Sequence, residues 1–309
     1  MAPEAASTPS NAPTLRIGTR GSALALAQTR MVAAMIERTT GMSCELVTVR
    51  TEGDDLSIPL SAPPRPGAFA ARLRDVLAEG AVDLAVHSFK DLPFAPAEGL
   101  RIVAVPPRAA ARDALVSASG QGLDALPRGA TVGTSSPRRA AALTRRRPDL
   151  QIVPIRGNVD TRLRKVRTGV VDAAVIAAAG LDRLGLGEQI TELIDPNVLV
   201  PAPAQGALAV EMRADHPHAD AVAELDDPGS RLRVVAERRV LAVVQATCTT
   251  AIGAYCQFSG SSLNLIADLT DHLDVEHAHV ELCGALGRDH LLSASMLGEQ
   301  AAKRLLGRA

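Results

Sequence analysis

Aromatic residues are nearly missing from this chain of 309 residues, which has no tryptophan, one tyrosine and only 2% aromatics in total. Proteins that bind single-stranded nucleic acids stack the bases on such side chains, so this class of function is disfavoured. An excess charge is missing as well, because the formal net charge is -1. No long-range field attracts DNA or an anionic membrane. The basic stretch TRRRP at residues 144–148 is best interpreted as a solvated helix end, and we expect no nucleic-acid partner.

Signals for export, membrane insertion and metal binding are also missing. Residues 1–13 lack the basic start and the apolar stretch of a signal peptide, and we expect a disordered tail there. The longest apolar run, residues 170–181, contains Asp172 and is shorter than a membrane span. None of the four cysteines belongs to a C-x-x-C pair, and the histidine pairs have no third ligand at metal spacing. The sequence therefore predicts a cytoplasmic protein with no metal site.

Alternating strand and helix patterns fill the first hundred residues, which is typical of βαβ units and a mostly parallel sheet. The Pro-rich residues 53–67 interrupt the pattern and predict a long functional loop. The expected strands cover residues 14–20, 44–51, 82–89 and 100–107, and the expected helices cover residues 23–40 and 69–80.

The same alternation starts again near residue 130, without an internal sequence repeat. The patterns predict strands at residues 131–136, 151–157, 171–180 and around Pro203, with helices at residues 137–147 and 159–169. A helix from about Ser230 to Gln245 and period-two strands, clearest at residues 273–282, follow. We therefore expect two α/β domains and a small C-terminal α+β domain, with boundaries at 14–105 plus 200–218, 106–199 and 219–309.

Polar side chains follow the ends of the predicted strands, where open α/β sheets bind their ligands. An isolated Lys-Asp dipeptide is most simply a surface ion pair, but here it stands among other candidates at equivalent places. These are Arg20, Ser22, Ser88, Lys90 and Asp91 in the first unit, and Thr134, Ser135, Ser136, Arg138, Arg139, Arg156, Asn158 and Arg162 in the second.

The arginines of the second unit indicate an anionic ligand. Arg138 and Arg139 fall in the first turn of a helix, where cations oppose the helix dipole unless an anion lies nearby. Guanidinium groups grip carboxylates through two parallel hydrogen bonds. The sequence contains neither G-x-x-x-x-G-K-[ST] nor G-x-G-x-x-G after a strand, so nucleotides are disfavoured. A polycarboxylate or a phosphate is the expected ligand.

Several stretches, in this order and at these spacings, are RIGTRGSALALAQ, VHSFKDLP, VGTSSPRRAAAL, PIRGNVDTRL, AAAGLDRLG, LVPAPAQGALAVE and AERRVL. Together they resemble the porphobilinogen deaminase family, also called hydroxymethylbilane synthases, from about residue 14 to residue 256. The resemblance implies two domains like those of periplasmic binding proteins, with the active site in the cleft between them, and a third domain.

The family implies a transferase of haem and other tetrapyrrole biosynthesis, which joins four porphobilinogen molecules head to tail into hydroxymethylbilane and releases ammonia at each step. The product grows on a dipyrromethane cofactor that is bound through a thioether to a cysteine of the third domain. In this chain the matching position is Cys248, in AERRVLAVVQATC. The resemblance also implies a monomer.

The resemblance further assigns roles to the polar residues at the strand ends. Asp91 would be the catalytic carboxylate that stabilises positive charge on the reacting pyrroles and relays protons, and the charge of Lys90 would help to keep it ionised. The implied cofactor-binding residues are Ser88, Lys90, Thr134, Ser136, Arg138 and Arg139. The implied substrate-binding residues are Arg20, Ser22, Arg156, Arg162, Arg183 and Gln205.

Two segments depart from the family pattern. The cysteine is flanked by Thr247 and Thr249, where the family commonly has glycine before it, and a β-branched residue is strained if the backbone there needs a positive φ. The loop usually reads G-x-G-x-F, and here Pro66 precedes Gly67 while Phe69 is kept. These departures leave a second hypothesis open: a catalytically impaired paralogue that binds or senses a carboxylate ligand.

Overall fold

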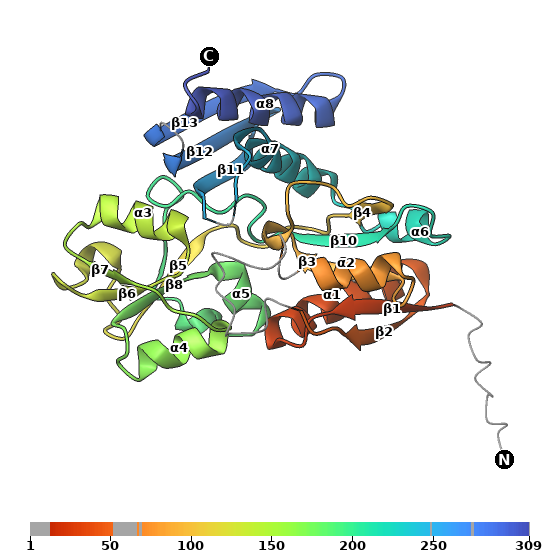
Figure 1. The fold of residues 1–309 in the computed structure, drawn as a ribbon, viewed down its shortest axis with the longest axis horizontal. Coiled ribbons are helices and arrows are strands. Elements are labelled where there is room, and N and C mark those ends of the chain that lie inside the picture. The colour runs from red at the N-terminus through yellow and green to blue at the C-terminus, as the bar shows by residue number, and fades with distance from the viewer. Residues whose placement is uncertain (1–12, 52–66, 68–69, 248, 273–274, 309) are drawn as a thin grey trace.

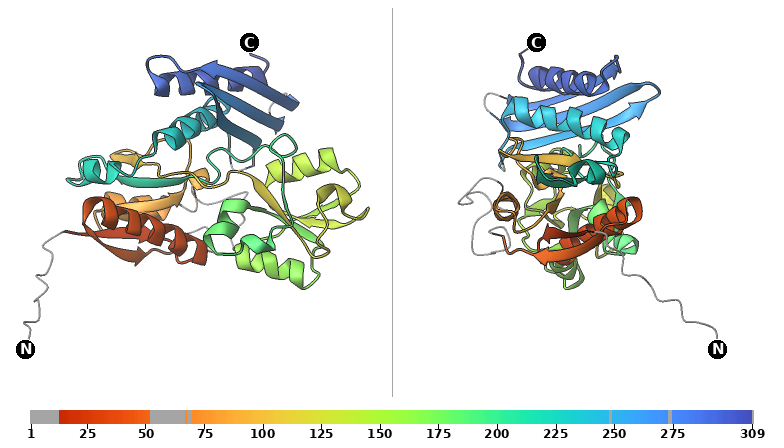
Figure 2. Two further views of the ribbon diagram at one scale, coloured as in Figure 1. Left: turned by 180° about the vertical axis from the view of Figure 1, so that it is seen from behind. Right: turned by 90° about the vertical axis from the view of Figure 1, so that its right-hand side faces the viewer.

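Three β-sheets organise the molecule in the computed structural model, which describes residues 13–51, 67, 70–247, 249–272 and 275–308. Two α/β units lie side by side, and the C-terminal unit lies across them (Figures 1 and 2). The expected fold class is confirmed by these sheets. The predicted tail at residues 1–13 lies, apart from Pro13, outside the described residues, as does nearly all of the loop at 53–67.

The first unit holds a five-stranded sheet in the order β2-β1-β3-β10-β4. Its faces bury two apolar clusters, one under helix α1 and the other under helix α2. Its elements are β1 (Thr14–Thr19), α1 (Ala23–Thr40), β2 (Ser43–Thr48), α2 (Ala71–Ala78), β3 (Leu84–Ser88), the 3-10 turn η2 (Phe89–Asp91), β4 (Leu100–Ala104), β10 (Leu208–Arg213) and α6 (Ala219–Ala223).

The second unit repeats this plan with the strand order β7-β6-β8-β5-β9. In both sheets a parallel trio is followed by an inserted antiparallel strand, β10 in the first and β5 in the second. The elements of the second unit are β5 (Asp113–Ser117), η3 (Leu123–Ala125), β6 (Thr131–Gly133), α3 (Pro137–Arg146), β7 (Gln151–Val153), α4 (Val159–Arg167), β8 (Ala173–Ala177), α5 (Ala178–Arg183), η4 (Gly187–Gln189) and β9 (Glu192–Leu193).

Each sheet is mostly parallel, as expected, but contains one inserted antiparallel strand. Strand β10 runs antiparallel to both β3 and β4, and β5 runs antiparallel to both β8 and β9, so both sheets are mixed. Each inserted strand is reached by a segment that crosses from the other unit, residues 105–112 or 200–207. The chain therefore enters each sheet from the end at which β3 or β8 leaves it.

Three local expectations also differ from the structure. The predicted strand at residues 171–180 ends at Ala177, and Ala178 begins helix α5, because the apolar period does not separate a buried strand from a buried short helix. Residues around Pro203 form no strand, and β10 begins at Leu208. Helix α6 packs Ala219 and Val222 into the core of the first unit, which therefore extends past residue 218.

The third unit packs two helices on an antiparallel three-stranded sheet in the order β11-β12-β13. Its first helix, α7, also packs Val234 against Phe89, Leu92 and Val105 of the first unit. The elements are α7 (Pro228–Val244), β11 (Ala251–Ser259), β12 (Ser262–His272), β13 (Val275–Ala285) and α8 (His290–Leu305). The third unit is thus joined directly to the turn that follows β3.

Candidate active site

A cavity of about 450 Å³ lies between the two α/β units, where strands β1, β3, β6, β7 and β8 end. Among the described residues, the charged side chains that line it are five cations and a single carboxylate, that of Asp91. The lining residues with polar side chains are Arg20, Ser22, Lys90, Asp91, Ser135, Arg139, Arg156, Asn158, Thr161 and Arg162. All of these except Thr161 belong to the candidates that the sequence indicated at the strand ends, so the structure brings nine of those candidates together.

Helix starts fix part of this wall. Ser22 caps helix α1 by accepting the N–H of Ala25, and Asn158 caps helix α4 by accepting the N–H of Thr161. Ser136 caps helix α3 in the same way and is followed by Pro137 at the first helical position, as predicted. Capped starts leave the remaining free N–H groups of each first turn facing the end of the strand before it.

Burial disfavours the charged forms of two cations of the wall, Lys90 and Arg162. Burial lowers the pKa of Lys90 to about 8, and the nearby Arg139 lowers it further while Asp91 and Asp113 act in the opposite direction. Burial, assisted by Arg139, also lowers the pKa of Arg162 to about 10. A carboxylate placed among these groups would favour their charged forms. The wall is therefore suited to an anionic ligand with several carboxylates.

Asp91 ends the turn η2, which begins directly after strand β3. Within the described residues it is the only carboxylate on the cavity wall. It is partly buried, and the cavity that it lines also contains five cations, several polar side chains and a few apolar ones among the described residues. A carboxylate in such a place can stabilise positive charge that develops on a ligand held by the surrounding cations.

A buried polar chain beneath the wall connects the two units. The Lys90 ammonium donates to Oε1 of Gln205 at 3.1 Å, and the amide of Gln205 donates to Asp113 at 3.0 Å. Asp113 also accepts hydrogen bonds from Arg138 and Arg139 at 2.7–3.0 Å. Burial alone would raise the pKa of Asp113, but the two guanidinium groups outweigh it and hold that pKa well below its usual range.

The remaining predicted residues lie behind the wall rather than on it. The hydroxyl of Ser88 exchanges hydrogen bonds with the amide of Gln28, and Thr134 accepts the N–H of Ser136. Arg183 donates to the carbonyl of Gly206 at 2.7 Å, and its buried Nε has no hydrogen-bond partner among the described residues. Arg138, Ser136 and Gln205 are likewise absent from the lining, so these residues support the groups that face the cavity.

Two buried carboxylates were missed by the sequence analysis, and both hold the crossing segments. Asp113 opens an apolar strand, DALVS, which is the one signal that could have found it. Glu237, fully buried on α7, accepts from Arg108 at 2.7 and 3.0 Å and from the N–H groups of Ala204 and Cys256. A glutamate within a helical AER stretch carries no local sign of such burial.

The predicted attachment residue, Cys248, lies outside the described residues, but its neighbours form a hydroxyl-rich turn. The N–H of Thr247 donates to the hydroxyl of Thr250 at 2.9 Å, and the hydroxyls of Thr247 and Thr249 are 3.0 Å apart. Among the described residues other than glycine, φ is positive at Ala204, Gln245 and Asp271 and not at Thr247. The strain that a threonine would suffer in a left-handed backbone does not arise here.

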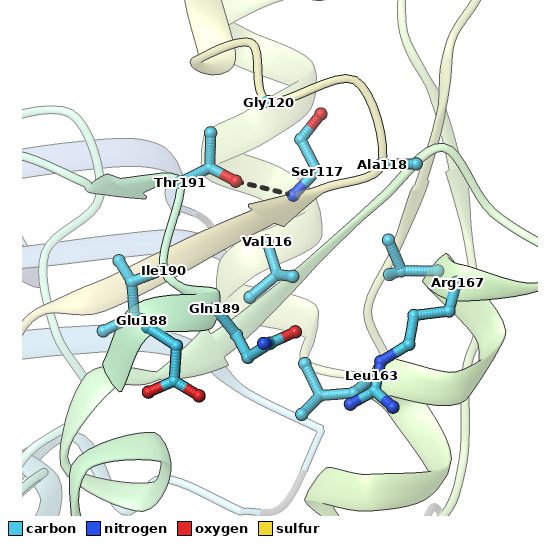
Figure 3. A pocket seen from close by; sticks show the side chains of 11 residues that line it. Val116, Ser117, Ala118, Gly120, Leu163, Arg167, Glu188, Gln189, Ile190 and Thr191 are labelled. Atoms are coloured by element: carbon cyan, nitrogen blue, oxygen red, sulfur yellow. Dashed lines mark hydrogen bonds between the residues drawn. The ribbon is translucent and has the colours of Figure 1, made fainter. Parts of the chain in front are cut away.

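A second pocket, of about 530 Å³, lies in the second unit where strand β5 ends, at the opposite ends of the strands from the cavity (Figure 3). Strand β5 ends there at Ser117, whose N–H is bonded to the hydroxyl of Thr191, and none of the predicted site residues lines it.

In the described part of the chain, no helix is long and apolar enough to cross a bilayer. No three His, Cys, Asp or Glu residues among those described are arranged to hold a metal ion.

Comparison with known proteins decides the family. The family model "Porphobilinogen deaminase, dipyromethane cofactor binding domain" matches residues 15–221. This chain belongs to the porphobilinogen deaminase family. It is 46% identical to the porphobilinogen deaminase of Cutibacterium acnes over 94% of both chains. It is also 45% identical to that of Mycobacterium tuberculosis over 95% of this chain and 93% of the relative.

Two solved structures of other proteins resemble the chain at low sequence identity. A periplasmic substrate-binding protein of an ABC transporter from Coxiella burnetii is 16% identical, with a TM-score of 0.44 over 70% of this chain and 93% of its own. The methionine-binding protein MetQ gives the same TM-score at 14% identity over 69% of this chain and 89% of its own.

Proposed function

We propose that this chain is a hydroxymethylbilane synthase that condenses four porphobilinogen molecules head to tail with release of ammonia. The observation that carries the proposal is the cavity between the two α/β units, with five cations and one carboxylate on its wall. Each porphobilinogen brings an acetate and a propionate, so a growing chain gains two carboxylates at every step. A wall with this excess of cations matches such a ligand and disfavours a neutral one.

The same wall fits a resident dipyrromethane, which carries four carboxylates. When bound, the dipyrromethane supplies the electron-rich pyrrole at which the chain is extended. Lys90 and Arg139 are the cations best placed to hold its carboxylates, because both belong to the polar chain fixed by Gln205 and Asp113. Arg138, Thr134 and Ser136 support this set from behind, Ser88 fixes the start of the turn that bears Lys90, and Cys248 is the proposed covalent anchor.

The other cations of the wall are proposed to orient the incoming porphobilinogen. Arg20 and Ser22 lie on the first unit, while Arg156 and Arg162 lie on the second, so a molecule held by both sets spans the cavity. Gln205 and Arg183 act through the crossing segment, the former by holding Lys90 and the latter by bonding Gly206. Asp91 stabilises the positive charge that develops on porphobilinogen when ammonia leaves. It also relays protons during the condensation.

The proposal includes three domains, divided near residues 105, 199 and 225. The separate sheets support the first two divisions, and the packing of α6 supports the third. It also includes a cytoplasmic monomer that takes small molecules and no nucleic acid. The net charge of -1 supports the absence of a nucleic-acid partner, because it offers no long-range field that would attract a polyanion.

An intact mass tests the proposal directly. The purified protein is expected to exceed its sequence mass by two porphobilinogen units less two ammonia molecules, and fragmentation should locate the excess at Cys248. Brief incubation with porphobilinogen should then add further units of the same mass. A chain that stays unmodified in both conditions would contradict the proposal and would favour a carboxylate-binding protein without catalysis.

A further inference from the structure

Arg238, on helix α7, holds the backbone of the turn that follows strand β3. Its guanidinium donates to the carbonyl oxygens of Phe89 at 3.2 Å, Leu92 at 3.1 Å and Pro93 at 2.5 Å. The same group lies over the ring of Phe89, with its central carbon 4.6 Å from the ring centroid. One side chain of the third unit therefore satisfies three carbonyls of a turn in the first unit.

These contacts are unusual for a buried cation. Within the described residues, Arg238 makes no ion pair, whereas Arg138, Arg139 and Arg108 each pair with a buried carboxylate. Burial lowers the pKa of Arg238 to about 10, with a further contribution from Arg74. Arg238 is partly buried, and the free energy that this burial costs is offset by carbonyl dipoles, an aromatic face and the charge of Glu211. Packing alone would not require a charged residue at this position.

The turn that Arg238 holds carries two charged residues of the cavity wall, Lys90 and Asp91. Lys90 and Asp91 both lie between the bonded carbonyls of Phe89 and Leu92. At the far end of the turn, Gly67 lies close to Pro93, since a Cβ atom at Gly67 would lie 2.7 Å from it. The hydrogen bonds of Arg238 therefore tie the position of the turn to α7.

Helix α7 is itself anchored to the crossing segments by the residue next to Arg238. Glu237 binds Arg108 of one crossing segment and the N–H of Ala204 of the other. Val234, one turn earlier, packs against Phe89 and Leu92. In the sequence, Cys248 follows ten residues after Arg238. The helix that leads to the proposed attachment residue therefore also sets the place of Asp91.

We propose that Arg238 is a positioning residue for the condensation reaction, which holds the turn 89–93 so that Asp91 and Lys90 keep a fixed place relative to α7. The inference rests on the proposed function, since it assigns Arg238 a part in that reaction. It acts through the turn backbone and does not line the cavity. A displacement of about 1 Å at a reacting group costs on the order of 100-fold in rate, so loss of this clamp should be visible in kcat.

The test compares Arg238→Lys and Arg238→Gln with Arg239→Lys as the matched control. Arg239 is the next residue of the same helix, but its guanidinium pairs with Glu299 of α8. Hydrogen exchange of the wild type and the three variants is measured first, because it needs no activity. The N–H of Leu92, which donates to the carbonyl of Phe89, should exchange about tenfold faster in both Arg238 variants and unchanged in the control.

Steady-state kinetics of the loaded enzymes then separate positioning from stability. We expect kcat to fall about tenfold in Arg238→Lys and about 100-fold in Arg238→Gln, with KM for porphobilinogen changed less than about threefold. The intact mass should show that the cofactor is retained. Unchanged exchange at residues 89–93, or a normal kcat in Arg238→Lys with faster exchange, would overturn the inference. An inactive, unmodified wild type would instead contradict the proposed function, while the exchange result would still decide whether Arg238 holds the turn.

Discussion

The cavity wall and the region around the crossing segments differ in how their charged side chains are paired. Around the crossing segments, the buried carboxylates of Asp113 and Glu237 are each bound by arginines at 2.7–3.0 Å. On the wall, Lys90 donates to the amide oxygen of Gln205 and Arg162 donates to the carbonyl of Gly157, and within the described residues no carboxylate is bonded to either. Arg139 joins the two regions, because it lines the cavity and also binds Asp113.

The difference separates charges that hold the fold from charges that await a ligand. A buried ion pair that is complete adds specificity to the packing, whereas removal of one partner is costly. A largely buried cation that bonds only neutral groups, as Lys90 and Arg162 do within the described residues, lowers the stability of the free protein and binds an anion more strongly for that reason. The wall therefore lowers the free energy of unfolding of the free protein, and a bound polycarboxylate is expected to raise it again.

The largest expected effect removes the single carboxylate of the wall. Asp91→Asn should lower kcat by about 10³- to 10⁴-fold, or ~4 to 5 kcal/mol of transition-state stabilisation, because a neutral amide neither balances a cation nor relays a proton. Steady-state assays of ammonia or product release measure this loss. The exposed Asp220, 97% accessible and paired with Arg101, supplies the control Asp220→Asn, which should keep full activity. A normal kcat in Asp91→Asn would remove its catalytic role.

The next largest effect is expected from removing the negative charge of Asp113 beside the crossing segments. Asp113→Asn leaves Arg138 and Arg139 buried without a counter-charge, and we expect a loss of about 3–5 kcal/mol in the free energy of unfolding. Because its pKa is depressed in the folded state, the contribution of Asp113 is present above the unfolded pKa and is lost as the pH falls through the folded one.

Urea denaturation near pH 7 and at decreasing pH measures both parts of this expectation. Asp124→Asn is the control, since Asp124 pairs with Arg146 at the surface and should contribute less than about 1 kcal/mol. Equal losses in the two variants would show that the buried cluster is no stronger than a surface pair.

A smaller effect, of opposite sign, is expected on the wall. In a Cys248→Ala background that cannot load a cofactor, Lys90→Met should raise the free energy of unfolding by about 2–3 kcal/mol at pH 7. The pKa of Lys90 is lowered from 10.5 to about 8, so the folded state disfavours its charge below pH 8. Stability of the parent protein then rises between pH 8 and 10.5, and the advantage of the variant disappears over that interval.

Denaturation curves of the two proteins across this pH range check the sign. Lys165→Met, on helix α4 and outside the cavity, should show no comparable gain. A destabilising Lys90→Met at pH 7 would mean that Lys90 is already balanced in the free protein, and the contrast between wall and crossing segments would disappear.

Much of the fold and of the wall could be predicted from local pattern. The helix at residues 23–40 was placed with its bounds because Ser22 caps it and Gly41, with φ of 71°, ends it. The wall residues were found because strand ends in such sheets converge on one edge. The helix at Ala178–Arg183 was missed because its apolar residues continue those of β8 without a break.

The succession of strands and helices, the family and the residue types that follow each strand can all be derived from the amino-acid order, because hydrophobic period, capping and motif spacing are local properties. Which charges are paired depends on the folded chain. Asp113 binds Arg138 and Arg139, and Arg238 binds the carbonyls of the turn 89–93, across long stretches of chain. Such pairs depend on how the crossing segments bring the units together, and no local pattern contains that information.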